Sequence, residues 1–229
     1  MLQKGVLTGT VLQLGPISVT YAVVVTWMIM AGLVLFSFLT VHRFSRQPGL
    51  LQVAVEGTIG AIDDAIGAVL PRQADIVFPF IATLWIFIVT ANLIGLIPGV
   101  HAPTGDLSVT AALALVVFLS VHWFGVRIEG IGPYLRHYLK PSPLLLPFHV
   151  ISEVSRTVTL AVRLFGNMMS LEMAALLVLL VAGFLAPVPL LMLHLVEALI
   201  QAYIFGMLTL IYIAGAIQTQ ESRQQQEKG

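Results

Sequence analysis

One stretch is the most informative for the fold: Leu160-Ala161-Val162-Arg163-Leu164-Phe165-Gly166-Asn167. It contains an arginine within a long apolar segment. The surrounding residues, 148–182, are apolar enough to lie in lipid. A permanently charged guanidinium at that depth costs from about 3 to well above 10 kcal/mol. Arg163 could pair with a buried acid, or its guanidinium could reach the membrane interface. A third explanation, a functional charge in an ion path, is favoured by the polar residues that follow.

The composition is that of a membrane protein. Of the 229 residues, 58% are hydrophobic and only 10% are charged, and the mean hydropathy is +0.97. These values predict an all-α polytopic membrane protein rather than a soluble domain. The net charge of zero does not suggest a nucleic-acid surface, and the absence of cysteine excludes disulfides and thiolate sites. The six histidines show no metal-ligand spacing, so we expect neither a metal nor a cofactor.

Apolar runs predict about five membrane helices and one or two interfacial amphipathic helices in a single domain, residues 1–229. A helix of residues 148–182 would be about 50 Å long, so it must tilt steeply or lie partly along the membrane. The predicted segments are a first span at 18–41, an interfacial helix at 50–70, a second span at 76–97, a third span at 107–124, a cytoplasmic basic segment at 127–140 and a long helical hairpin of 148–182 and 188–218.

The positive charges predict the orientation of the chain. His42-Arg43-Phe44-Ser45-Arg46 follows the first span, whereas Lys4 is the only cation before it. The loop His101–Asp106 holds no Lys or Arg, and several cations lie in 127–140. Cytoplasmic loops carry the excess of Lys and Arg. The N-terminus is therefore expected outside and the C-terminus in the cytoplasm.

Polar side chains continue from Arg163 along the predicted hairpin. Asn167 lies one helical turn after Arg163, and His194, Glu197 and Gln201 step by three and four residues along one face of the last helix. Such intramembrane polar residues mark ion paths. Carboxylates and an imidazole can hold and release a proton, whereas an arginine stays charged and forms a fixed barrier. Asn167 and Gln201 also suit a plain interhelical hydrogen bond.

A hairpin that turns at Gly183 predicts which of these residues share a depth. Gln201 should then lie level with Arg163, Glu197 near Asn167, and His194 near Glu172. These pairs occupy the exterior half of the hairpin, which suits an ion that enters from outside.

Four motifs in order resemble subunit a of the rotary F-type ATP synthases. They are Asn92-Leu93-Ile94-Gly95-Leu96-Ile97-Pro98-Gly99, Pro103-Thr104-Gly105-Asp106-Leu107-Ser108-Val109-Thr110, Arg163-Leu164-Phe165-Gly166-Asn167-Met168 and Gln201-Ala202-Tyr203-Ile204-Phe205. The resemblance covers nearly everything from residue 50 onward. Ser155-Arg156 and the compact length are also similar to the N-type variant of these ATPases.

The resemblance implies a stator subunit beside a ring of c subunits, with b-type peripheral stalk subunits, in a bacterial cytoplasmic (inner) membrane. Two offset half-channels would pass protons or Na⁺ to and from the ring carboxylates, which couples ion flow to rotation and to ATP synthesis or hydrolysis. Arg163 matches the arginine that separates the half-channels. Asn167, Glu172, His194 and Gln201 match positions that line the exterior one. No catalytic site is implied, and the chain lacks a Walker-type loop.

Two residues depart from the family pattern. Glu197 adds a carboxylate one turn from His194, where many members carry an apolar residue, and we include it among the ion-path residues. His149 stands where an acid is common. The alternative from another class is a self-contained secondary transporter in which Arg163 binds an anionic substrate. That alternative needs a substrate cavity and usually repeated halves, and the sequence has no internal repeat.

Overall fold

The computed structural model describes residues 10–14, 17–42, 49–97, 100–132, 134, 146–183 and 188–227. Within these residues the fold is almost wholly helical, and five helices are long and apolar enough to cross a membrane. The predicted all-α membrane fold is therefore confirmed. The five helices are α1 (Tyr21–His42), α3 (Ala74–Ile94), α4 (Leu107–Glu129), α6 (Leu146–Ala182) and α7 (Val188–Glu227).

Helix ends differ from the sequence prediction mainly where a helix leaves the apolar region. Helix α4 continues through Arg127 to Glu129, and α7 continues to Glu227 instead of ending at 218. The added stretch of α7 is rich in Gln, Glu and Arg, which are good helix formers. Hydropathy therefore locates the apolar part of a helix and not its end. The predicted basic segment 127–140 begins inside α4, and its residues 133 and 135–140 lie outside the described part of the chain.

A short β-hairpin precedes α1, and the sequence analysis did not predict it. Strand β1 (Thr10–Leu14) pairs antiparallel with β2 (Ile17–Thr20), with Leu14 opposite Ile17. The chain then passes directly from β2 into α1. A hydropathy window long enough to find a membrane span averages over strands of four or five residues, so it does not detect such a hairpin.

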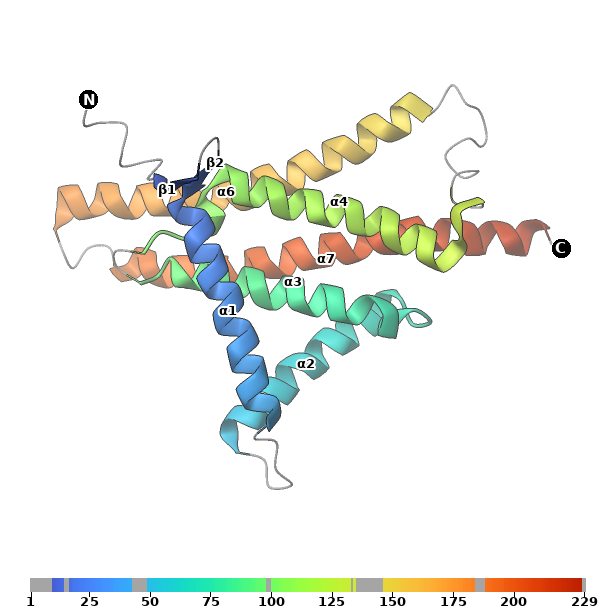
Figure 1. Cartoon of the computed structure of the whole chain (residues 1–229), viewed down its shortest axis with the longest axis horizontal. Helices are drawn as coiled ribbons and strands as arrows, with labels where there is room; N and C mark the ends of the chain where they lie inside the picture. The colour runs from blue at the N-terminus through green and yellow to red at the C-terminus, as the bar shows by residue number, and fades with distance from the viewer. Residues whose placement is uncertain are drawn as a thin grey trace.

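The long helices lie along one direction and α1 crosses them steeply (Figure 1). Helix α4 packs against α6 and α7, and α3 packs against α7 on the other side. If α1 crosses the membrane along its normal, α6 and α7 must be strongly inclined. That inclination is what the length of α6 requires.

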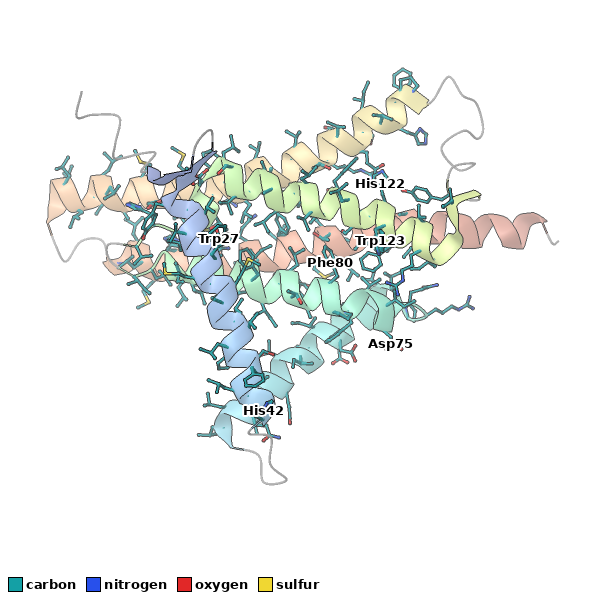
Figure 2. The ribbon with its side chains drawn as sticks, in the orientation of Figure 1. Trp27, His42, Asp75, Phe80, His122 and Trp123 are labelled. Atoms are coloured by element: carbon teal, nitrogen blue, oxygen red, sulfur yellow. The ribbon has the colours of Figure 1, made fainter. Side chains whose placement is uncertain are left out.

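The core includes buried residues of every long helix, and one glycine permits a close approach of α7 to α3. A Cβ on Gly206 of α7 would overlap the Trp85 indole of α3. The Trp85 Nε1–H donates to the Tyr203 carbonyl oxygen at 3.3 Å, and the two rings stack with centroids 5.8 Å apart. Trp27 and Trp123, both labelled in Figure 2, are by contrast exposed, as side chains facing lipid would be.

Helix α2 (Leu50–Val69) is the helix that the sequence predicted to lie in the membrane interface. It is not among the five candidate spans, and it packs against α3. Ile59, Ile62 and Ile66 recur at helical spacing, which predicts one apolar face; only part of that face is used in this packing, because Ile62 and Ile66 are buried whereas Ile59 is exposed. Its location in the interface stays a prediction.

Candidate ion path

Arg163 lies near the middle of α6, and its side chain is exposed. Among the described residues it has no hydrogen-bond or ion-pair partner. The explanation that Arg163 is paired with a buried acid therefore finds no support in this part of the chain. A permanent charge without a partner in an apolar helix needs a counter-charge from elsewhere.

The exposure of Arg163 follows from the periodicity of α6. Leu160, Leu164 and Leu171 recur at spacings of four and seven residues and are buried against α4 and α7. Thr159 and Ser170, at the same spacings around Arg163, are exposed. One side of α6 is thus packed into the protein, and the side that carries Arg163 makes no contact that buries it.

Asn167 and Gln201 join α6 to α7 just beyond Arg163. The Asn167 Nδ2 donates to the Gln201 Oε1 at 2.7 Å. Gln201 is only 2% exposed, and its Nε2 is buried without a hydrogen-bond partner in the described part of the chain. The plain interhelical hydrogen bond considered from the sequence is therefore present, but it leaves one buried donor unsatisfied.

This contact corrects the predicted register of the hairpin. Asn167 was expected near Glu197, and its partner Gln201 lies one turn further along α7. A second contact agrees with the new register: the Arg156 Cζ lies 5.5 Å from the centre of the Tyr212 ring. The prediction assumed two straight helices and a turn symmetric about Gly183. A small displacement of that turn changes the partner of a given residue by twice as many positions, which accounts for the partners of Asn167 and Arg156.

A second polar group lies nearer the turn between α6 and α7. The Nδ1 atom of His101, in the α3–α4 connection, and the Oε1 atom of Glu172 are in close hydrogen-bond contact. On α7, His194 is buried and its Nε2 has no hydrogen-bond partner among the described residues. Glu197 and Glu172 both lie close enough to act electrostatically on the His194 ring. The predicted nearness of His194 and Glu172 is thus present in the structure.

A chain of hydrogen bonds fixes the connection that carries His101. The Thr104 hydroxyl, in the short 3₁₀ helix η1 (Pro103–Gly105), donates to the Asn92 Oδ1 at 2.8 Å. The Asn92 Nδ2 donates in turn to the Ala198 carbonyl oxygen at 3.2 Å. Thr104 and Asn92 are both fully buried. The two sequence motifs that contain them therefore tie the α3–α4 connection to α3 and α7.

The sequence analysis missed His101. It is a single histidine in a loop, and no spacing rule connects it to Glu172, which follows 71 residues later. The only available signal was its place in a loop expected on the exterior side. The six predicted residues otherwise fall into two groups and one isolated residue: Asn167 with Gln201; Glu172 with His194 and Glu197; and Arg163 alone on the exposed side of α6.

These features define a class of protein: a polytopic helical membrane protein with titratable and amide groups between its last two long helices and, beside them, an arginine that has no partner in the described part of the chain. Comparison with known proteins identifies the family. The family model described as ATP synthase A chain matches residues 23–214. "ATP synthase subunit a 2" of Pelobacter propionicus is 66% identical over 216 residues, which cover 94% of this chain and 95% of that protein.

Other bacterial relatives agree. "ATP synthase subunit a 1" of Hahella chejuensis is 61% identical over 217 residues, covering 95% of this chain and 92% of the relative. "ATP synthase subunit a" of Legionella pneumophila is 55% identical over 226 residues, covering 98% of each. The chain belongs to the ATP synthase A chain family, so the predicted resemblance to subunit a of F-type ATP synthases is confirmed. Family membership makes it a bacterial membrane subunit of that complex without a catalytic site of its own, and it favours this function over a self-contained secondary transporter.

Proposed function

We propose that this chain forms the stationary ion path of the ATP synthase membrane sector, with Arg163 as the divider between two offset half-channels. Glu172, His194 and Glu197 would line the exterior half-channel at its outer part. Asn167 and Gln201 would line its inner end, one turn from Arg163. The ion is a proton or Na⁺.

The observation that carries this proposal is the state of Arg163. Its guanidinium is exposed, central in α6 and unpaired among the described residues. The complement of such a group is a carboxylate on another molecule, because a guanidinium binds a carboxylate in a planar two-point contact. A c-subunit ring that presents one carboxylate after another to α6 would supply that complement.

Two buried nitrogen atoms support a polar path beside the arginine. The Nε2 atoms of His194 and Gln201 have no hydrogen-bond partner within the described ranges, and the two residues are seven positions apart on α7, two turns along one face. Buried polar groups without a protein partner are the places where bound water is found. Water at these two sites would connect the outer group of residues to the Asn167–Gln201 pair.

The proposed mechanism follows from these positions. An ion enters from the exterior side, passes Glu172 and His194, and neutralises a ring carboxylate beyond Gln201. The ring carboxyl group, neutral once it has bound the ion, can then leave the arginine and move into lipid as the ring turns. After nearly a full turn the ion is released on the cytoplasmic side of Arg163. The fixed positive charge keeps the emptied carboxylate ionised and prevents an ion from crossing directly between the half-channels.

The partners and the orientation belong to the same proposal. The c ring would contact the exposed side of α6, and b-type stalk subunits would hold the chain in place. The N-terminus would lie outside and the C-terminus in the cytoplasm, because Arg43 and Arg46 follow α1 in the sequence and Arg127 lies in the last turn of α4. Likeness to the N-type variant stays a prediction.

Substitution of Arg163 tests the proposal. Arg163→Ala and Arg163→Lys are each expected to abolish ATP-driven ion pumping by the complete synthase in vesicles, with normal amounts of assembled complex. Lysine keeps the positive charge but lacks the planar guanidinium that binds a carboxylate at two points. Loss of pumping in both variants would therefore show that geometry matters as well as charge. Arg127→Ala is the matched control, because Arg127 is an exposed arginine at the end of α4. Normal pumping by Arg163→Ala would rule out the proposed function.

A further inference from the structure

We propose that His101 is the proton-collecting group at the exterior mouth of the ion path, and that it passes protons from the solvent to Glu172. The inference deepens the proposed function and rests on it. It also commits to the ion, which is the proton.

The geometry places His101 between the solvent and Glu172. The two side chains touch through Nδ1 and Oε1, and the His101 side chain is 65% exposed whereas that of Glu172 is 29% exposed. The imidazole is therefore the member of the pair that meets water. On α7, His194 is buried, so a further titratable group lies deeper in the protein than this half-exposed pair.

Gly105 and Tyr21 lie next to the pair, and the segment that contains Gly105 is fixed to the helices. A Cβ at Gly105 would lie 3.2 Å from the Glu172 Oε2, so the absence of a side chain there leaves room for the carboxylate. The ring of Tyr21, the first residue of α1, meets the His101 ring edge to face with centroids 6.4 Å apart. The η1 segment between them is fixed through Thr104 and Asn92. The contact is thus part of a built site and not a chance meeting of two surface groups.

The titratable groups near the pair come from two further helices. Tyr21 of α1 meets the His101 ring, and α7 carries His194, which interacts with Glu172, and Glu197 three residues later. Asp106, at the start of α4, is engaged with the backbone and side chain of Ser108. No Lys or Arg stands in the connection from residue 100 to 106 to repel an entering cation.

The transfer can be written with all protons accounted for. Neutral His101 starts with its proton on Nδ1, which donates to the Glu172 carboxylate. A hydronium ion protonates Nε2, the Nδ1 proton moves to the Glu172 Oε1, and a neutral imidazole faces a carboxylic acid. Glu172 then releases its proton inward. The exposed ring regains its starting form by losing the Nε2 proton to water and taking one at Nδ1, with no net change. Histidine is suited to this role because its ordinary pKa lies near neutrality.

The test uses the complete synthase in proteoliposomes whose lumen faces the exterior side of the chain. ATP synthesis is driven by an imposed proton gradient, with the lumen loaded with either a non-shuttling buffer or imidazole. His101→Ala and His101→Gln should each synthesise ATP about tenfold more slowly than the native complex. The loss should be smaller than the hundredfold or more typical of general acid–base groups, because water still reaches Glu172. Luminal imidazole should restore most of the rate in both variants relative to the native complex.

The glutamine variant and a control separate this role from a structural one. Glutamine keeps a hydrogen-bond donor for Glu172 but cannot carry a proton, so a normal rate in His101→Gln would overturn the proposal. A loss that imidazole does not restore, or no loss in either variant, would overturn it equally. His42→Ala is the control, because His42 lies at the end of α1 remote from the hairpin (Figure 2) and should leave the rate unchanged.

Measuring ATP synthesis driven by a Na⁺ gradient distinguishes failure of this inference from failure of the proposed function. If the native complex synthesises ATP from a ²²Na⁺ gradient and not from a proton gradient, the proton-collecting role is wrong. The ion path itself would still stand, provided that Arg163→Ala stops the Na⁺-driven synthesis. If Arg163→Ala has no effect with either ion, the proposed function fails.

Discussion

The hydrogen-bonded chain from Thr104 through Asn92 to Ala198 makes a prediction that a double-mutant cycle can test. Asn92→Leu removes both hydrogen bonds and leaves the buried Thr104 hydroxyl without its acceptor. Interhelical hydrogen bonds in membrane proteins are worth about 0.6 kcal/mol on average, and a buried polar group left unpaired costs roughly 1–3 kcal/mol. We expect Asn92→Leu to lower the free energy of unfolding by about 2–4 kcal/mol.

Thr104→Val removes one bond and leaves the Asn92 Oδ1 unpaired, so it should cost about 1–2 kcal/mol. The double variant lacks both the Thr104 hydroxyl and the Asn92 amide, so neither is left without its hydrogen-bond partner. Its cost should therefore fall short of the sum of the single costs by about 1 kcal/mol. Thr90→Val is the matched control, since the Thr90 hydroxyl donates only to the Ile86 carbonyl oxygen of its own helix. Its effect should stay within about 0.5 kcal/mol.

The assay is equilibrium unfolding of the purified subunit in mixed micelles by titration with sodium dodecyl sulfate. Intrinsic fluorescence reports the folded fraction, because one of the three tryptophans, Trp85, is buried beside Tyr203. Additive costs for Asn92→Leu and Thr104→Val would refute the coupling. So would a cost for Thr104→Val no larger than that of Thr90→Val.

Two further predictions concern the packing of α7. The chain has no native cysteine, so pairs of introduced cysteines can be joined by a short bifunctional thiol reagent. Cysteines replacing Asn167 and Gln201 should cross-link faster than cysteines replacing Asn167 and Glu197. The opposite order would support the register predicted from the sequence. Gly206→Ala should destabilise the subunit by about 1–3 kcal/mol in the same unfolding assay, because the added methyl group overlaps the Trp85 indole. A neutral Gly206→Ala would show that α3 and α7 are less closely packed than described.

The helices and their membrane character could be predicted because they follow from long apolar runs. The bounds of α2 and the starts of α4 and α7 agree with the sequence prediction to within a residue. The β-hairpin before α1 was missed because its strands are short. The end of α7 was predicted too early because the residues after 218 are polar but still favour a helix. Helical periodicity also placed His194, Glu197 and Gln201 along one side of α7 correctly.

The contacts between helices were only partly predictable. Sequence separation constrains a hairpin register to within about one turn, since each residue rises 1.5 Å and the turn itself is flexible in position. Glu197, the predicted partner of Asn167, and Gln201, its partner in the structure, are one helical turn apart and so differ by this uncertainty. The His101–Glu172 pair was beyond prediction, because it depends on how η1 is fixed to Asn92 and hence on the packing of several helices.

The most direct measurement of the central claim is a cross-linking comparison between α6 and the ring. Thr159→Cys places a thiol on the exposed side of α6, one turn before Arg163, whereas Leu160→Cys places it on the neighbouring side that is packed into the protein. Each is combined with a single cysteine next to the ring carboxylate of the c subunit, in membranes and under mild oxidation. We predict that the cysteine at 159 forms a disulfide with the c subunit and that the cysteine at 160 does not. Cross-linking at 160 in preference to 159, or at neither position, would contradict the placement of Arg163 opposite the ring carboxylates.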